Sequence, residues 1–154
     1  MKRLLPVVLM SFFAAAPVPG TAEETVADPL FVDVTEVDLN QFKWKKRPLV
    51  VFADTPDDPM FIEQLELLRS REPAMRERDV VVISDTDPDA ESDLRRKLRP
   101  RGFMLVIINK EGTVNVRKPF PWDGREISRS IDKMPIRQRE IREAKERARA
   151  GGTN

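Results

Sequence analysis

The sequence predicts an α/β domain in which helices flank a mixed central sheet. Three observations lead to this prediction. Short, continuous runs of apolar and β-branched residues have the composition of strands that are buried on both faces. Aspartate-proline pairs and a capping box mark helix starts between or after these runs. Strand and helix signals follow one another in the order β-α-β-α-β-β-α.

The first half of the chain contains two strand and helix pairs. Residues 49–53 (Leu-Val-Val-Phe-Ala) predict the first buried strand, and Asp58-Pro59 predicts a helix after it. An aspartate accepts hydrogen bonds from the free amides at a helix start, and proline fits the first helical position. Residues 80–83 (Val-Val-Val-Ile) predict the second strand, and Asp87-Pro88 predicts a second helix in the same way. Its core face would consist of Ala90, Leu94 and Leu98.

The second half predicts a hairpin and a covering helix. Residues 103–108 form the third apolar run, and residues 109–112 (Asn-Lys-Glu-Gly) predict a tight turn with glycine at a positive-φ position. A short strand over residues 113–117 returns, and a capping box over residues 123–126 predicts a helix that Pro135 ends. This element order is the core of the thioredoxin fold, because two crossovers followed by a hairpin build a mixed sheet.

Residues 1–22 are predicted to be a signal peptide. Lys2 and Arg3 precede an apolar run, Leu4 to Ala16, which is too short to span a bilayer core of ~30 Å. Small residues then provide a cleavage site near Ala22. We therefore expect a periplasmic or secreted protein, with no membrane span after cleavage because no second apolar run is long enough.

The remaining residues divide into four predicted parts. They are a flexible lead-in (23–37), a thioredoxin-like domain (38–135), a charged C-terminal helix (136–150) and a disordered tail (151–154).

The composition excludes several chemistries. The chain contains no cysteine, histidine or tyrosine, so it has no thiol for a redox cycle and lacks the commonest general base and metal ligand. Removing Lys2 and Arg3 from the 27 basic residues leaves 25 against 26 acidic ones, a net charge of −1. Nucleic-acid binding is not expected from such a balance. No motif predicts a cofactor, and any site must use Asp, Glu, Lys, Arg, Ser or Thr.

Several segments carry a resemblance to a known family. They are residues 42–53 (Phe-Lys-Trp-Lys-Lys-Arg-Pro-Leu-Val-Val-Phe-Ala), residues 78–83 (Arg-Asp-Val-Val-Val-Ile), Gly102-Phe103 with the turn 109–112, and residues 134–137 (Met-Pro-Ile-Arg). With the signal peptide, they resemble a bacterial exported family of unknown function, the domain of unknown function 4174 family. The resemblance covers roughly Leu39 to Arg142, and it departs from the family at Glu111, where aspartate is usual.

This resemblance also extends to a domain of vertebrate secreted matrix proteins of the sushi-repeat and coiled-coil-domain-containing kinds. It implies a thioredoxin-like fold related to peroxiredoxins, and it implies no established activity. In a thioredoxin fold the reactive cysteine lies between the first core strand and its helix. The same place here holds Asp54, Thr55, Asp57 and Asp58.

The loop 54–58 is therefore the first candidate site. Carboxylates are stabilised at the positive end of a helix, where they cap the helix or bind a cation or a basic partner. Lys110 and Arg117 flank the predicted hairpin and are candidates for an anion patch, although such charges commonly form a solvated face.

Two further patterns allow alternative readings. Asp85-Thr86-Asp87 follows a strand, as in phosphatases of the haloacid-dehalogenase type, and would make the protein a metal-assisted hydrolase. The alternating acids from Asp85 to Asp93 resemble an EF-hand start, but Ala90 replaces the required glycine and Arg96 the closing glutamate.

The sequence thus favours a non-enzymatic binding or structural protein of the cell envelope with an unidentified envelope or extracellular protein partner. The alternatives are the hydrolase using Asp85 and Asp87 and a degenerate oxidoreductase related to peroxiredoxins, which would need a borrowed cofactor.

Overall fold

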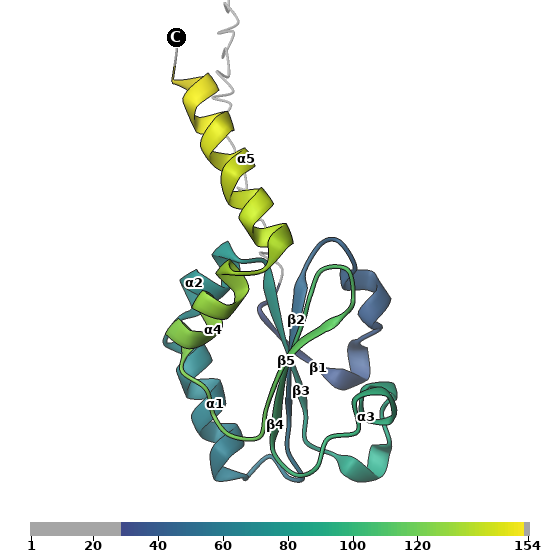
Figure 1. Ribbon diagram of the computed structural model, residues 1–154. Coiled ribbons are helices and arrows are strands. Elements are labelled where there is room, and N and C mark those ends of the chain that lie inside the picture. The colour runs from purple at the N-terminus through teal and green to yellow at the C-terminus, as the bar shows by residue number, and fades with distance from the viewer. Residues whose placement is uncertain (1–28, 153–154) are drawn as a thin grey trace, which may run out of the picture.

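The computed structural model describes residues 29–152 (Figure 1). A five-stranded sheet with the order β1-β3-β2-β4-β5 crosses the molecule. β1, β3 and β2 are parallel, whereas β4 is antiparallel to β2 and β5 is antiparallel to β4. The predicted mixed sheet is therefore confirmed. The strands are β1 (Phe31–Asp33), β2 (Arg47–Phe52), β3 (Val80–Asp85), β4 (Met104–Ile108) and β5 (Val114–Lys118).

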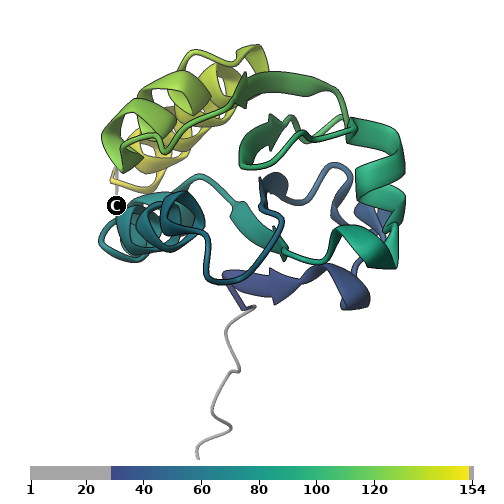
Figure 2. The same ribbon diagram turned by 90° about the horizontal axis from the view of Figure 1, so that it is seen from below.

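Helices cover both faces of this sheet (Figures 1 and 2). One face carries α1 (Pro59–Arg69), α2 (Glu72–Glu77) and α4 (Gly124–Asp132). The other carries α3 (Asp93–Leu98) and the short 3₁₀ turns η1 (Val34–Glu36) and η2 (Leu39–Phe42). A long helix, α5 (Pro135–Gly151), starts at one end of the sheet and extends away from the domain, as Figure 1 shows.

The core consists of two apolar layers separated by the sheet. All six residues of β2 are buried, because this strand lies in the middle of the sheet. Leu49 and Val51 pack with residues of α1 and α4, and Val50 and Phe52 pack with residues of α3. Burial alternates between the two layers along the strand, as the period of two requires.

Two of the predicted helix starts are confirmed. The side chain of Asp58 accepts a hydrogen bond from the backbone N–H of Met60 at 2.8 Å and caps α1. The side chain of Asp123 accepts from the N–H of Arg125 at 2.7 Å and caps α4. Glu126 does not complete the expected capping box, because its carboxylate pairs with Arg129 at 2.8 Å.

The predicted start of the second helix is wrong. Asp87 caps only a 3₁₀ turn, η3 (Pro88–Ala90), and Ala90 is exposed instead of lying on a core face. Glu91 then adopts a left-handed conformation with φ +44°, which interrupts the helix. The α-helix begins at Asp93 after a new cap, Ser92, which accepts from the N–H of Arg95 at 3.1 Å.

Residues 23–37 were expected to be a flexible lead-in, but the part from Phe31 onward has regular structure. β1 pairs in parallel with β3, with Phe31 opposite Val82, so the sheet begins before residue 38. A strand of three residues is too short to show a hydrophobic period. The predicted signal peptide 1–22 and residues 23–28 lie outside the described residues. At the other end, α5 reaches Gly151, one residue into the predicted tail.

Candidate functional site

The loop between β2 and α1 holds the first group of predicted site residues. Asp54, Thr55 and Asp57 are exposed, and Asp58 is half-buried where it caps α1. The loop is held by its own atoms: the hydroxyl of Thr55 accepts from the N–H of Asp57 at 3.3 Å, and the carbonyl of Thr55 accepts from the N–H of Asp58 at 3.2 Å. Helix capping thus explains Asp58, and hydrogen bonds within the turn explain Thr55. Neither involves the carboxylates of Asp54 and Asp57.

Asp54 and Asp57 project from this loop as free carboxylates. Neither side chain forms a hydrogen bond or an ion pair with any residue in the range 29–152. The loop before β4 lies close by, since a Cβ atom added to Gly102 would lie 4.0 Å from Oδ2 of Asp54. The described residues contain no group of three acidic side chains that could hold a metal ion. The loop therefore presents exposed negative charge.

Asp85, the first residue of the proposed hydrolase pair, is enclosed inside the domain. Its carboxylate accepts from Nε of Arg95 at 2.7 Å and from the hydroxyl of Ser92 at 2.5 Å. Arg95 in turn donates to the backbone carbonyl of Ala53 at 2.5 Å and lies over the ring of Phe52. The buried carboxylate is fully engaged in joining β3 to the start of α3, so it is not placed to attack a substrate or to bind a cation.

Asp87 has a local role of its own. Its side chain accepts from the N–H groups of Asp89 and Ala90 at 3.1 and 3.2 Å, which fixes η3. Asp93 pairs with Arg96 on the surface of α3. Three of the alternating acids, Asp85, Asp87 and Asp93, are therefore accounted for by a cap or by ion pairs, as expected for aspartates near helix starts.

Lys110 and Arg117 do not come together. Arg117 lies opposite Val106 of β4 and donates to the carbonyl of Leu98 at 2.5 Å, at the end of α3. Lys110 follows β4, four residues beyond Val106, which corresponds to about 13 Å along a strand. Arg117 therefore contacts the end of α3, whereas Lys110 forms ion pairs with Asp79 and Glu140 elsewhere in the fold.

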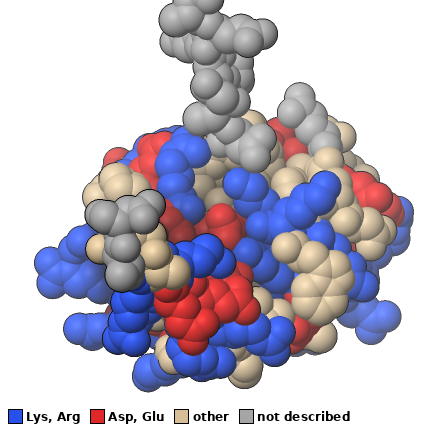
Figure 3. All heavy atoms as spheres, turned by 90° about the horizontal axis from the view of Figure 1, so that it is seen from above, with Lys and Arg blue, Asp and Glu red and all other residues tan. Residues whose placement is uncertain are grey.

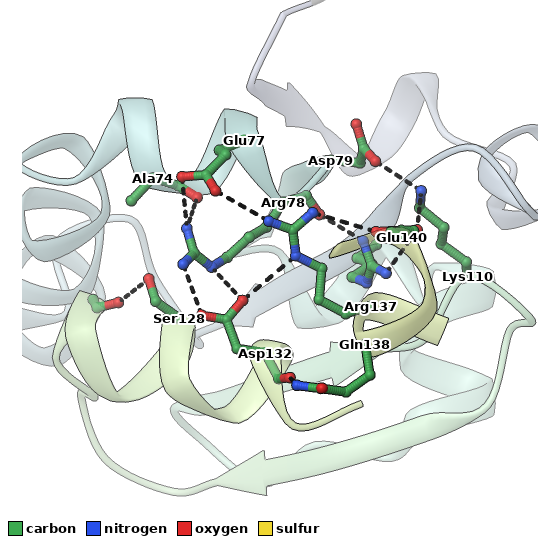
Figure 4. Close-up of polar contacts among 12 residues, drawn as sticks. Ala74, Glu77, Arg78, Asp79, Lys110, Ser128, Asp132, Arg137, Gln138 and Glu140 are labelled. Carbon is green, nitrogen blue, oxygen red and sulfur yellow. Dashed lines mark hydrogen bonds and ion pairs between the residues drawn. The ribbon is translucent and has the colours of Figure 1, made fainter. Parts of the chain in front are cut away.

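A cluster of charged side chains that the sequence did not predict lies at the end of the sheet where α5 begins (Figure 4). Arg47, the first residue of β2, is only 1% exposed. Its guanidinium donates to the carbonyl of Arg78 at 2.8 Å and to Glu140 of α5 at 3.0 Å. Lys110 pairs with the same carboxylate at 2.7 Å. We call the following set the charged cluster: Arg47, Glu77, Arg78, Asp79, Lys110, Asp132, Arg137 and Glu140.

The second half of the charged cluster joins α2, α4 and α5. Arg78 donates two hydrogen bonds to the carboxylate of Asp132, from Nε to Oδ1 at 3.0 Å and from Nη2 to Oδ2 at 2.8 Å. This is the bidentate geometry typical of arginine and a carboxylate. Arg137 reaches Glu77 at 3.1 Å, Glu140 at 3.4 Å and Asp132 at 3.5 Å. Ion pairs therefore attach the first two turns of α5 to α2, α4, β2 and the β4–β5 turn.

The acidic members of the cluster have altered acidity. Burial raises the pKa of Asp132, but the hydrogen bonds and charges of Arg78 and Arg137 outweigh burial and bring it below the usual value. Burial likewise raises the pKa of Glu140, but the hydrogen bonds and charges of Lys110 and Arg47 lower it by more. The pKa of Glu140 is therefore below its usual value. The pKa of Arg78 is raised, mainly by its hydrogen bonds to Asp132. All three groups are charged near neutral pH.

Comparison with known proteins identifies the family. The family model described as Domain of unknown function (DUF4174) matches residues 38–140. The chain belongs to the DUF4174 family. The matched segment ends at Glu140, the last member of the charged cluster, so the exposed remainder of α5 lies outside the part shared with the family.

Solved structures of peroxiredoxins are similar to this DUF4174 chain. One is the reduced 2-Cys peroxiredoxin of Plasmodium vivax, at 18% identity and a TM-score of 0.55, covering 68% of this chain and 85% of that one. Another is thioredoxin peroxidase I of Plasmodium yoelii, at 17% identity and a TM-score of 0.52, covering 67% and 80%. Such identities show a common fold and no common activity.

These similarities confirm the predicted thioredoxin-like fold in a chain that contains no cysteine. No curated protein sequence matches the DUF4174 chain significantly. Within residues 29–152, none of the helices has the length and apolar character needed to cross a membrane.

Proposed function

We propose that this DUF4174 protein is exported and acts as a non-enzymatic binding domain of the cell envelope, with the loop between β2 and α1 as its contact surface. One observation carries the proposal: Asp54 and Asp57 are exposed and have no partner among residues 29–152, whereas the buried carboxylate of Asp85 is fully engaged. Exposed, unpaired side chains are available to another molecule without breaking the fold.

The side chains next to the loop support protein recognition. Met60 and Ile62, in the first turn of α1, are 39% and 44% exposed. Together with Asp54 and Asp57 they form what we call the loop surface. Protein contacts combine apolar anchors with charges of complementary sign. The loop surface therefore suits a partner that offers a basic group beside an apolar side chain.

An enzymatic role has less support. Asp85 would have to release Arg95 and Ser92 before it could act as a nucleophile, and a thiol-based oxidoreductase needs a cysteine that the chain lacks. A generic phosphoester incubated with the protein and common divalent ions tests this directly. Turnover that depends on the metal and is abolished by Asp85→Asn would overturn the proposal.

Export is supported by the pattern of residues 1–22, in which basic, apolar and small residues succeed one another as in secretory signals. Expression of the full chain, followed by fractionation and mass measurement, tests it. We expect a mature protein that begins at Glu23 in the periplasmic or secreted fraction. A full-length chain in the cytoplasmic fraction would contradict export.

Partner capture tests the binding role. Immobilised protein is exposed to envelope extract, and the bound proteins are compared between the unmodified chain and the double variant Asp54→Asn and Asp57→Asn. Asp58 is left unchanged, because it caps α1. The matched control replaces two exposed acids of α5, Glu143→Gln and Glu146→Gln. We expect loss of a specific partner with the loop variant only, and equal capture by all three proteins would discard the site.

A further inference from the structure

Trp44 is an exposed aromatic residue in a strained backbone conformation. Its side chain is 64% exposed, the highest exposed fraction of any large apolar side chain in the described residues. Its φ is +65°, in the left-handed region that glycine adopts without strain and bulky residues rarely adopt. No other large apolar residue in the range 29–152 has a positive φ. The exposed ring and the backbone conformation are therefore both unfavourable for the isolated domain.

Hydrogen bonds of the turn after η2 impose this conformation. The carbonyl of Phe42 accepts from the N–H groups of Lys45 and Lys46 at 2.9 and 2.8 Å. The N–H of Trp44 donates to the carbonyl of Lys110 at 2.7 Å. Glycine would fit the same turn without strain, as it does at the ends of many helices. Because the fold does not require an aromatic residue here, the exposed ring indicates a contact with another molecule.

Two exposed lysines flank Trp44 in the chain. Lys43 and Lys45 form no ion pair with any residue from 29 to 152. Tryptophan and lysine are both typical of protein surfaces that contact lipid headgroups. Lysine is depleted from the surfaces by which proteins bind one another. The composition of this turn therefore favours a lipid surface over a protein pocket.

The end of the domain around Trp44 is basic as a whole. The Trp44–Lys110 hydrogen bond and the charged cluster bring together residues 38–47, 72–79, 109–112 and 132–151, which we call the α5 end. These segments contain 14 basic and 9 acidic residues, a balance of +5. The rest of the range 29–152 contains 11 basic and 14 acidic residues, a balance of −3. Figure 3 looks onto this end and shows lysine and arginine side chains spread around a smaller acidic patch.

We propose that the α5 end docks on an anionic lipid surface. The ring of Trp44 lies at the level of the headgroups, and Lys43 and Lys45 contact lipid phosphates. The turns before β2 and after β4 form the upper end of the domain body beside the start of α5 (Figure 1). One ring and two lysines provide a modest affinity, so the contact is peripheral and reversible.

The unequal charge of the two ends gives the docked domain an orientation. The α5 end is attracted to an anionic surface, whereas the loop surface, with Asp54 and Asp57, is repelled by it. The loop surface follows the end of β2, and Trp44 precedes the start of this strand. Docking would thus leave the loop surface accessible. It does not depend on the proposed binding function, because loss of partner capture would leave vesicle binding unchanged and the reverse also holds.

Sedimentation with lipid vesicles tests the proposal. The protein is the chain from residue 23 onward, because the apolar run 4–16 would bind lipid by itself. One set of vesicles contains phosphatidylcholine alone, and the other contains an equal mixture of phosphatidylcholine and phosphatidylglycerol at the same ionic strength. Heparin is a third probe, since it carries negative charge without a lipid. Tryptophan emission, recorded with each probe, reports whether the ring leaves water.

Two variants with matched controls separate the ring from the charges. Trp44→Gly removes the ring and relieves the backbone strain. Its control is Phe120→Ala, because Phe120 is 50% exposed and lies outside the α5 end. The second variant is Lys43→Gln with Lys45→Gln. Its control replaces two exposed basic residues outside the α5 end, Arg101→Gln with Arg125→Gln.

We expect binding to the mixed vesicles and none to phosphatidylcholine alone. Each lost lysine should weaken binding about fivefold, so the double lysine variant should bind about 25-fold more weakly. Trp44→Gly should bind about tenfold more weakly and should lose the blue shift of tryptophan emission. Both controls should stay within about twofold of the unmodified protein. The urea midpoint of Trp44→Gly should be no lower than that of the unmodified protein, because glycine removes the strain.

Four results would overturn the proposal. They are the absence of binding to the mixed vesicles, unchanged binding of Trp44→Gly, and an equal loss of affinity in a variant and its control. The fourth is binding to heparin that depends on Trp44 as strongly as vesicle binding does, which would assign the surface to an acidic polysaccharide. A lower urea midpoint of Trp44→Gly would show that the ring stabilises the fold, and it would remove the reason to assign the ring to a lipid contact.

Discussion

Arg47 and Glu140 are separated by 93 residues in the chain and form an ion pair of 3.0 Å across the end of the sheet. Arg47 is buried at the start of β2, and Glu140 lies in the second turn of α5. Because the same carboxylate also binds Lys110, one side chain of α5 joins the central strand to the β4–β5 turn. The pair is one of the ion pairs that attach α5 to the domain at this point.

Removing the charge of Glu140 should therefore destabilise the domain. Glu140→Gln leaves Arg47 buried with the carbonyl of Arg78 as its remaining partner. Breaking a fully buried pair costs about 3–5 kcal/mol, and since Glu140 is 23% exposed we expect a smaller loss, about 1–3 kcal/mol. Urea denaturation measures it. The exposed neighbour variant Glu143→Gln should change the free energy of unfolding by less than about 0.5 kcal/mol. Equal stability of the two variants would contradict this role.

Stability should also depend on pH through the acids of the charged cluster. Asp132 and Glu140 have pKa values lowered by folding, so the unfolded chain takes up their protons first as the pH falls. Their contribution is fully present above their unfolded pKa values, near 4, and is lost as the pH falls through the folded values. Denaturant titrations between pH 7 and pH 2.5 measure this loss. The double variant Asp132→Asn and Glu140→Gln should lose less stability over that range. If its free energy of unfolding depended on pH as steeply as that of the unmodified protein, these two acids would not be the source of the loss.

The two aspartates at the start of α1 should differ in their effect on stability. Asp58 caps the helix, so Asp58→Ala should lower the free energy of unfolding by about 1 kcal/mol. The carboxylate of Asp57 forms no hydrogen bond or ion pair with residues 29–152, and Asp57→Ala should change the free energy of unfolding by less than about 0.5 kcal/mol. Thermal unfolding of both variants measures the difference. A larger effect of Asp57→Ala than of Asp58→Ala would show that the capping assignment is wrong.

Asp85 and Asp87 provide a second matched pair. Asp85→Asn removes the charge that compensates Arg95, so we expect a loss of about 2–4 kcal/mol in urea denaturation. Asp87→Asn keeps a side-chain oxygen that can cap η3, and it should be nearly neutral. A hydrolytic role for both acids would instead predict little change in stability from either substitution.

The fold could be predicted from the sequence because its strands are apolar over several residues and its helix starts use strong signals. Leu49 to Phe52 and Asp58-Pro59 are examples in which composition and local chemistry agree. β1 could not be predicted, since three residues show no period and the strand depends on pairing with β3. At Asp87-Pro88 the same signal started only a 3₁₀ turn, because Glu91 adopts a left-handed conformation.

The candidate sites were predictable only in part. The position of Asp54 and Asp57 followed from the element order, which placed them between the first core strand and its helix. The charged cluster was missed because its members come from segments that are distant in the chain, and no spacing rule relates Arg47 to Glu140. One signal was present: an arginine directly before an apolar central strand requires a carboxylate partner elsewhere.

Photo-crosslinking in intact cells tests most directly whether this domain works by binding through the loop surface. A photoreactive phenylalanine analogue replaces Asp57 in one strain and the exposed Arg129 of α4 in another. We predict a discrete, larger adduct with an envelope protein from position 57 and none from position 129. The absence of an adduct at position 57, or the same adducts from both positions, would contradict the account.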